Sequence, residues 1–223
     1  MGNHIIVRGM NRDVGFPVRT WEHTEWRFHG RNRTETRIVC AHWTGAENSV
    51  RTMYENMMGD SALGQSSPLS VHFAVDAKGN VYQLADTELR AAHCRAHDMN
   101  SCSIGIEFVS RGTSATASAK GVHRLRVSDW IHGERVAYWD LLPIQIEVGV
   151  RLIERLCDIY DLPLRVPEDA LGNVASTELP TEILKNFRGV IGHLHAESRK
   201  YDPGMRLLRA VQTRARERKN LVG

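Results

Sequence analysis

A short stretch near the C-terminus concentrates side chains that could bind a metal ion and act on a polar substrate. Residues 192–204 read GHLHAESRKYDPG and hold imidazole, carboxylate and ammonium groups within a dozen positions. A catalytic zinc ion typically takes three protein ligands and keeps a fourth position for water or substrate. His193 and Asp202 could supply two of these ligands, and the ammonium group of Lys200 could stabilise an oxyanion beside them. A third ligand must come from another part of the chain.

His42 is the candidate for the third ligand. The apolar run RIVCAH at residues 37–42 ends at Thr44-Gly45, which predicts a buried strand with His42 at its carboxyl end. In open α/β sheets, ligands gather at the carboxyl ends of the strands. A histidine that ends a core strand is also commonly a structural residue, so the strand alone leaves both interpretations open.

A carboxylate lies in the middle of a second predicted strand, SIGIEFV at residues 103–109. Strand alternation places Glu107 on the same face as the small residues Ser103 and Gly105 and turns three apolar side chains to the other face. Burying a carboxylate without a partner is unfavourable, and the small neighbours leave room above it for a substrate or a water. Glu107 is therefore a candidate general base. The alternative is a glutamate on an edge strand that faces bulk water.

Other periodic segments predict the elements that position these groups. Residues 70–84 read as a strand, a tight turn and a returning strand, with His72 on the less apolar face of the first strand. Apolar residues at helical spacing predict amphipathic helices over residues 50–57, 143–160 and 203–219. Residues 59–68 form a loop rich in Gly, Ser and Pro. The connection over residues 164–187 is polar and has little periodicity.

Length and composition predict one domain over residues 1–223. Hydrophobic residues make up 42% of the sequence and charged residues 25%, as in soluble globular proteins that bury a sizeable core. We interpret residues 1–36 as an N-terminal wrap, irregular from residue 9 onward. Residues 111–140 begin with the low-complexity stretch RGTSATASAKG, predicted to be mobile, and form an insertion beside the cleft.

The basic residues are concentrated in the predicted helix over residues 203–219, while the formal net charge of the whole chain is only +3. Such a helix is usually a solvated face. The functional interpretation is a weak attraction to an anionic surface such as the cell envelope. No nucleic-acid-binding motif accompanies the helix, so we do not expect a nucleic acid partner.

The cysteines and the apolar segments bear on cellular location. Cys40, Cys94, Cys102 and Cys157 form no compact pair, which favours reduced thiols in a reducing compartment. No apolar stretch approaches the roughly 18 residues of a transmembrane helix. The apolar run at the N-terminus is too short for a signal peptide. We therefore expect a cytoplasmic protein that could act on the cell wall after release.

Several motifs occur in one order along residues 38–204. They are IVCAH at 38–42, SVHF at 70–73 with GNVY at 79–82, AH at 92–93, Asn100 through SIGIE at 103–107, and GH at 192–193 through KYDPG at 200–204. With these motifs the chain resembles the zinc-dependent N-acetylmuramoyl-L-alanine amidases of the type-2 amidase family, related to peptidoglycan-recognition proteins and phage amidases. The resemblance implies an α/β fold in which helices flank a central mixed β-sheet.

The resemblance also implies a site and a reaction. It implies zinc ligands at His42, His193 and Asp202 and catalytic groups at Glu107 and Lys200. The implied reaction is hydrolysis of the amide between N-acetylmuramic acid and L-alanine, in peptidoglycan or in soluble muropeptides. Glu107 would take a proton from the attacking water and deliver it to the leaving amine, and Lys200 would stabilise the tetrahedral oxyanion.

The resemblance further implies that three polar residues line the substrate cleft: His72, His93 and Asn100. Some family members carry a tyrosine at the position of Val71, so the version of the mechanism that uses Glu107 is the one available here. His195 stands where many relatives have an acidic residue. The loop before Lys200 is one residue shorter than in many relatives, which bears on the reach of that side chain.

Three alternatives remain open at this point. One is a peptidoglycan-recognition protein that binds without hydrolysis, although such relatives typically lose a zinc ligand. Another is an unrelated zinc hydrolase, although the sequence has no HExxH motif. Within the amidase family, a phage or prophage endolysin and a cytosolic muropeptide-recycling enzyme both fit, and the extra loop and basic helix favour the lysin. The sequence leaves the oligomeric state open.

Overall fold

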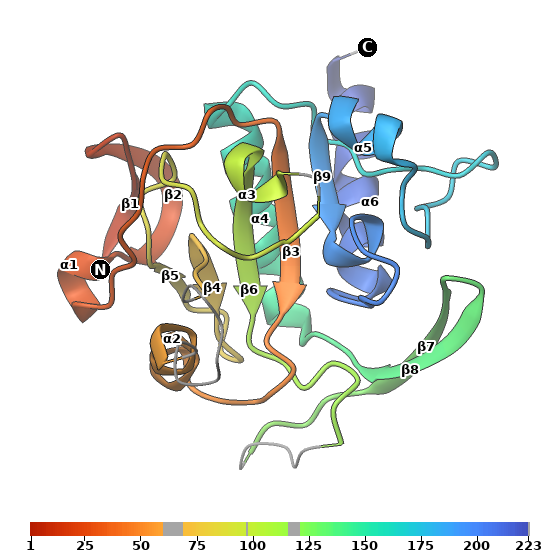
Figure 1. Cartoon of the computed structure of the whole chain (residues 1–223), viewed down its shortest axis with the longest axis horizontal. Coiled ribbons are helices and arrows are strands. Elements are labelled where there is room, and N and C mark those ends of the chain that lie inside the picture. The colour runs from red at the N-terminus through yellow and green to blue at the C-terminus, as the bar shows by residue number, and fades with distance from the viewer. Residues whose placement is uncertain (60–68, 97, 116–120, 223) are drawn as a thin grey trace.

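A mixed β-sheet forms the centre of the computed structural model, which describes residues 1–59, 69–96, 98–115 and 121–222 (Figure 1). Its strands are β1 (Gly2–Val7), β2 (Met10–Arg19), β3 (Ile38–Trp43), β4 (Phe73–Val75), β5 (Val81–Gln83), β6 (Ser103–Phe108) and β9 (Gly189–Gly192). They lie in the order β1-β2-β5-β4-β6-β3-β9. The four strands β4, β6, β3 and β9 run parallel to one another, whereas β5 is antiparallel to β4. The predicted α/β class with a central mixed sheet is confirmed.

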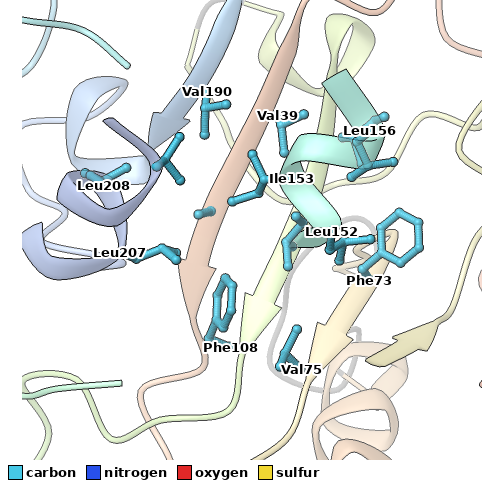
Figure 2. Close-up of a cluster of buried hydrophobic side chains, with 14 of the residues drawn as sticks. Val39, Phe73, Val75, Phe108, Leu152, Ile153, Leu156, Val190, Leu207 and Leu208 are labelled. Carbon is cyan, nitrogen blue, oxygen red and sulfur yellow. The ribbon is translucent and has the colours of Figure 1, made fainter. Parts of the chain in front are cut away.

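Two long helices, α4 (Pro143–Ile159) and α6 (Met205–Val222), cover one face of this sheet. Figure 2 shows strand residues such as Val39 and Phe108 facing Leu152 of α4 and Leu207 of α6. All four side chains are buried. Full burial of such a side chain contributes about 1.5–3 kcal/mol, which explains why the amphipathic spacing of both segments predicts this layer.

Three shorter helices lie on the opposite face: α2 (Val50–Gly59), α3 (Met99–Cys102) and α5 (Thr181–Asn186). Apolar residues of α2 pack with Val71 and Ala74. Residues of α3 and α5 pack with Cys40 and Ile191. The cysteines of the chain are free and buried. No helix in the described ranges is long and apolar enough to cross a membrane.

Residues 10–19 correct the prediction of an irregular segment from residue 9 onward. They form β2, which is antiparallel to β1 and parallel to β5. Val14, Phe16 and Val18 are buried on alternate positions of this strand. The alternation spans only a few residues among charged neighbours, so the polar composition hides it. The short helix α1 (Trp21–Thr24) follows this strand.

The predicted insertion contains a hairpin made of β7 (Arg126–Ile131) and β8 (Glu134–Trp139), which projects from the body of the molecule (Figure 1). Within the low-complexity stretch that precedes it, residues 116–120 lie outside the described residues. The same holds for residues 60–68 of the predicted loop after α2.

The arginines of α6 are paired within the molecule. Their partners are acidic side chains of neighbouring elements: Arg206 with Asp140, Arg209 with Asp129, Arg214 with Glu154, Arg216 with Glu168, and Arg218 with Asp158 and Glu154. Surface pairs of this kind contribute about 0–1 kcal/mol each. The acidic neighbours reduce the positive charge that the helix presents to an anionic surface. The helix is therefore a weaker argument for a lysin than the sequence alone suggested.

Candidate metal centre and active-site cleft

Strands β3 and β9 bring together the two histidines predicted as ligands. The strands are parallel neighbours, with Ala41 opposite Gly192. His42 follows Ala41 near the end of β3, and His193 follows β9 directly, in the short 3₁₀ helix η2 (His193–His195). Consequently the two Nδ1 atoms lie 3.0 Å apart, and both side chains are buried.

Asp202 completes a triangle with these two nitrogens. Its Oδ2 lies 3.0 Å from Nδ1 of His193 and 3.2 Å from Nδ1 of His42. The backbone N–H of Leu194 donates to the Asp202 carbonyl at 3.1 Å, and this hydrogen bond connects the turn at residues 202–203 to η2. A Cβ at Gly192 would lie 2.6 Å from Cδ of Pro203, so only glycine allows this close approach.

The triangle fits a zinc ion. Tetrahedral zinc with ligand bonds of about 2.0–2.2 Å holds its ligand atoms roughly 3.3–3.6 Å apart, so the triangle would open by a few tenths of an ångström around the ion. The three edges here measure 3.0, 3.0 and 3.2 Å. Two imidazoles and one carboxylate also form a known donor set for catalytic zinc, with a fourth position left for water. His42, His193 and Asp202, the predicted ligands, are therefore brought together in one suitable arrangement.

Charges within the triangle are strongly coupled. Burial and the neighbouring His193 lower the pKa of His42 to about 4. Burial also opposes protonation of His193, but its hydrogen bonds with Asp202, Cys94 and Glu197 outweigh this and raise its pKa to about 11. Burial likewise disfavours the Asp202 carboxylate, yet the hydrogen bonds from both histidines hold its pKa well below the ordinary value. In the metal-free protein, His193 is therefore an imidazolium, and zinc must displace its proton.

Glu107 lies beside the first ligand. In the parallel register of β3 and β6, His42 is directly opposite Glu107. The carboxyl group lines the cleft, and its Oε2 is buried without a hydrogen-bond partner among the described residues. Burial, with a smaller contribution from the charge of Asp202, raises the pKa of Glu107 to about 8. A buried acid of this kind in a cleft is typical of a catalytic group.

The raised pKa of Glu107 predicts how stability depends on pH in the metal-free protein. The unfolded chain releases this proton near pH 4.5 and the folded chain near pH 8, so stability falls between these values. The loss is about 1.4 kcal/mol per pH unit. Because Glu107→Gln cannot ionise, its free energy of unfolding should exceed that of the wild type by several kcal/mol at pH 8 and by little at pH 4.5.

Denaturant titrations of both chelator-treated proteins at the two pH values measure this difference. The same difference at both pH values would contradict a raised pKa for Glu107 in the folded protein.

The inserted hairpin braces the segment that carries Lys200, whose side chain lines the cleft. His132, in the hairpin turn, accepts the N–H of Glu178 at its Nδ1, so its Nε2 carries the proton and donates to the Lys200 carbonyl at 2.9 Å. The hydroxyl of Tyr201 donates to Oε1 of Glu134 at 2.6 Å. These contacts anchor the backbone of Lys200 and the side chain of Tyr201 to the hairpin.

Removing the contact between His132 and the Lys200 backbone should slow catalysis without loss of the metal. One hydrogen bond contributes about 0.5–1.5 kcal/mol, so we expect His132→Ala to lower kcat/KM by roughly 2- to 10-fold with unchanged zinc content. His29→Ala, a change at an exposed histidine, is the control and should leave both quantities unchanged. Wild-type kinetics in His132→Ala would show that Lys200 does not need the hairpin.

His72 does not line the cleft. It is fully buried, its Nδ1 accepts the N–H of Gly105 at 3.0 Å, and its Nε2 donates to the Leu89 carbonyl at 2.8 Å. Burial, followed by the charge of Arg33, lowers its pKa to about 3. The cleft-lining role that the resemblance implied for His72 is therefore wrong, because backbone groups of Leu89 and Gly105 occupy both ring nitrogens.

His93 and Asn100 do line the cleft, as predicted. Oδ1 of Asn100 accepts the backbone N–H groups of His93 and Cys94, both at 2.9 Å, and so shapes the loop between them. The His93 ring lies over Gly105, where a Cβ would be 2.7 Å from its Cγ. The space that we predicted for a substrate or a water above this strand is therefore occupied in part by an imidazole.

Two residues that the motifs did not assign a role surround the metal centre. His195 is fully buried, accepts the N–H of Gly192 at Nδ1 and donates from Nε2 to the Ala175 carbonyl, which holds η2 in place. Glu197 contacts His193. Its spacing of four residues from His193 is the one signal in the sequence that could have indicated this contact.

One open cleft, with a volume of about 1540 Å³, contains all of the predicted ligands and catalytic groups. It is lined by residues of α2, by residues 92–95 and by residues 199–202, among others. The metal triangle, Glu107 and Lys200 thus share one solvent-accessible site.

Comparison with known proteins identifies the family. The model of the family described as N-acetylmuramoyl-L-alanine amidase matches residues 32–205, a range that holds every predicted ligand and catalytic residue. The chain belongs to this amidase family. It is accordingly an N-acetylmuramoyl-L-alanine amidase and not an unrelated zinc hydrolase. No curated protein sequence matches it.

Solved structures share its fold. The amidase LysC from Clostridium intestinale URNW has 12% identity and a TM-score of 0.53, over 92% of this chain and 97% of that one. AmpD, solved as a selenomethionine derivative, has 15% identity and a TM-score of 0.51, over 91% and 99%. AmiD from E. coli has 17% identity and a TM-score of 0.48 over 94% of this chain, which spans 66% of the AmiD chain. At these identities the likeness to LysC and AmpD concerns the fold.

Proposed function

We propose that this amidase is zinc-dependent and hydrolyses the amide between the lactyl group of N-acetylmuramic acid and L-alanine, in peptidoglycan or in muropeptides. The observation that supports the proposal most strongly is the buried triangle of His42, His193 and Asp202 in the same cleft as Glu107. When bound there, zinc would polarise the scissile carbonyl and lower the pKa of a bound water to about 7.

Glu107 would move the proton. It lies opposite His42 in the sheet register, and its Oε2 has no hydrogen-bond partner among the described residues. The positive charge of a nearby zinc ion would lower the pKa of this carboxyl group, and the ionised carboxylate could then accept a proton from the attacking water. The same carboxyl group would then donate that proton to the nitrogen of the leaving L-alanine, which departs as a neutral amine. Residues of this type contribute typically about 100- to 10,000-fold to the rate.

Lys200 would stabilise negative charge on the scissile carbonyl oxygen. Its side chain lines the cleft, and its backbone is held by the hairpin residue His132. Removal of one comparable donor costs about 3–4 kcal/mol of transition-state stabilisation. His93 and Asn100 would form part of the wall that binds the substrate.

The size of the cleft suits a large substrate. Pockets for small ligands measure roughly 300–1,000 Å³, whereas this cleft measures about 1540 Å³. A sugar linked to a peptide is the kind of extended ligand that such a cleft can hold. Intact cell wall and soluble muropeptides offer the same scissile bond, so the choice between a lytic and a recycling role depends on which of them reaches the cleft.

Mass spectrometry of the products tests the proposal. The enzyme should release a peptide with a free L-alanine amine and leave the muramic acid with a free lactyl carboxylate. A chelator should stop the reaction and added zinc should restore it. Cleavage of another bond, or full activity in the chelator, would overturn the proposal. Parallel assays on intact sacculi and on soluble anhydro-muropeptides distinguish the lytic from the recycling role.

A further inference from the structure

Glu197 contacts a metal ligand without belonging to the ligand triangle. His193 faces the triangle with Nδ1, while its Nε2 lies 3.0 Å from Oε1 of Glu197. The Glu197 side chain is about one quarter exposed, at 26%, beside a His193 side chain that is 7% exposed. None of the catalytic steps described above uses this carboxylate.

We propose that Glu197 is a positioning residue that fixes His193 as an Nδ1 ligand and links the metal centre to the wall of the cleft. The inference rests on the proposed zinc-dependent function. In zinc sites, a ligand histidine commonly donates its second N–H to a carboxylate, which fixes the tautomer and the ring orientation and strengthens the ligand.

The hydrogen bond decides which nitrogen can bind metal. A neutral imidazole has one protonated and one unprotonated nitrogen, and an ionised carboxylate can only accept. When a bound metal ion has displaced one of the two protons of the His193 imidazolium, the contact with Glu197 keeps the remaining proton on Nε2. The unprotonated Nδ1 then points at Oδ2 of Asp202 and Nδ1 of His42, where the zinc ion would sit.

The same oxygen of Glu197 also holds the cleft wall. Oε1 accepts the backbone N–H of Arg95 at 3.1 Å and the thiol of Cys94 at 3.8 Å, and both residues line the cleft. Glu197 thus joins the loop at residues 92–95 to His193. A substrate that shifts this loop would therefore also shift His193, because the Glu197 side chain contacts both.

The cluster of Cys94, His193 and Glu197 is close enough to hold a metal ion of its own. Its hydrogen bonds favour the positioning role. Oε1 of Glu197 already receives three donors, one of them a backbone N–H that cannot be removed by deprotonation at ordinary pH. A second metal would have to displace these donors and would need Nε2 of His193 without its proton.

A parallel arrangement at the other histidine supports this reading. Nε2 of His42 lies 2.9 Å from Nδ1 of His93, and Nε2 of His93 lies 3.2 Å from Oγ of Ser103. The Ser103 hydroxyl in turn donates to the Met99 carbonyl, so each group in the series can donate to the next. His42 is thereby also held with Nδ1 free for the metal. The neutral groups of His93 and Ser103 thus position His42, whereas the charged carboxylate of Glu197 positions His193.

Zinc affinity measured by chelator competition at fixed pH tests the proposal. We expect Glu197→Ala to weaken zinc binding by about 10- to 100-fold. Glu197→Gln should lose less, because its amide oxygen can still accept from Nε2. Glu182→Ala removes an exposed glutamate of α5 and should bind zinc like the wild type. Nitrogen-15 NMR of the zinc-loaded wild type should show a protonated, slowly exchanging Nε2 on His193, and Glu197→Ala should lose this protection.

The unfolding midpoint of each metal-free variant shows whether it folds. If Glu197→Ala does not fold, the zinc affinity of Glu197→Gln tests the proposal. One zinc per chain bound as tightly in the Glu197 variants as in the wild type would overturn the inference and leave the proposed function intact. Two zinc ions per wild-type chain, reduced to one in Glu197→Ala, would overturn it in favour of a second metal site. A wild type that binds no zinc would overturn the proposed function itself.

Discussion

Glu107→Gln is expected to lose most of the turnover while it keeps the fold and the metal. An amide cannot take the proton of the attacking water, and it cannot deliver one to the leaving amine. The substitution preserves the shape of the side chain opposite His42, so the strands should pair as before. We expect the rate of muropeptide hydrolysis to fall by roughly 100- to 10,000-fold.

Zinc content and circular dichroism of the same preparation are the controls, and both should match the wild type. The variant should also resist denaturant better than the wild type when both are metal-free, because the unpaired acid is gone. Hydrolysis by Glu107→Gln at a rate near that of the wild type would contradict the proton-transfer role. His93 would then be the better candidate, since His72 is fully buried and bonded to backbone groups.

His193→Ala is expected to reduce zinc from about one equivalent per chain to a small fraction of that amount. The substitution removes one corner of the triangle and leaves the carboxylates of Asp202 and Glu197 without their shared imidazole. Breaking a buried pair by removal of one partner is destabilising by about 3–5 kcal/mol, so the variant should also unfold at lower denaturant concentration. Metal analysis after gel filtration measures the loss.

Lys200→Ala is the matched comparison, because Lys200 lines the cleft but is not a ligand. It should retain zinc and lose activity, which separates metal binding from catalysis. Undiminished zinc in His193→Ala would show that the ligands are elsewhere.

The elements that carry the ligands were predictable from the sequence because their patterns are local. The apolar run before His42 predicted a buried strand, and alternation in the second strand placed Glu107 on the face opposite to Ile104 and Ile106. Parallel pairing then sets these two residues side by side. The resemblance to a family supplied the assignment of His42 as a ligand, since a strand-end histidine alone is ambiguous.

Contacts between distant segments were not predictable in the same way. The backbone that covers His72 comes from Leu89, and the donors to Glu197 come from the loop around Cys94 and Arg95. The hydrophobic periodicity of a segment does not indicate such pairs, because each depends on how separate loops meet in space. The ion pairs of α6 are a further example, since their partners lie on other elements.

The buried alternation of β2 was missed for a different reason. Its apolar residues Val14, Phe16 and Val18 have the period of a strand, but glycine and proline, which strands disfavour, stand between them, and the residues just before them are polar. The pattern is present in the sequence and short.

Anomalous X-ray diffraction at the zinc absorption edge, from crystals grown with zinc, tests the assignment of the metal centre most directly. We expect one anomalous peak per chain, within bonding distance of Nδ1 of His42, Nδ1 of His193 and Oδ2 of Asp202, at about 2.0–2.2 Å from each. A peak bounded instead by Cys94 and Glu197, or no peak inside the triangle, would contradict it.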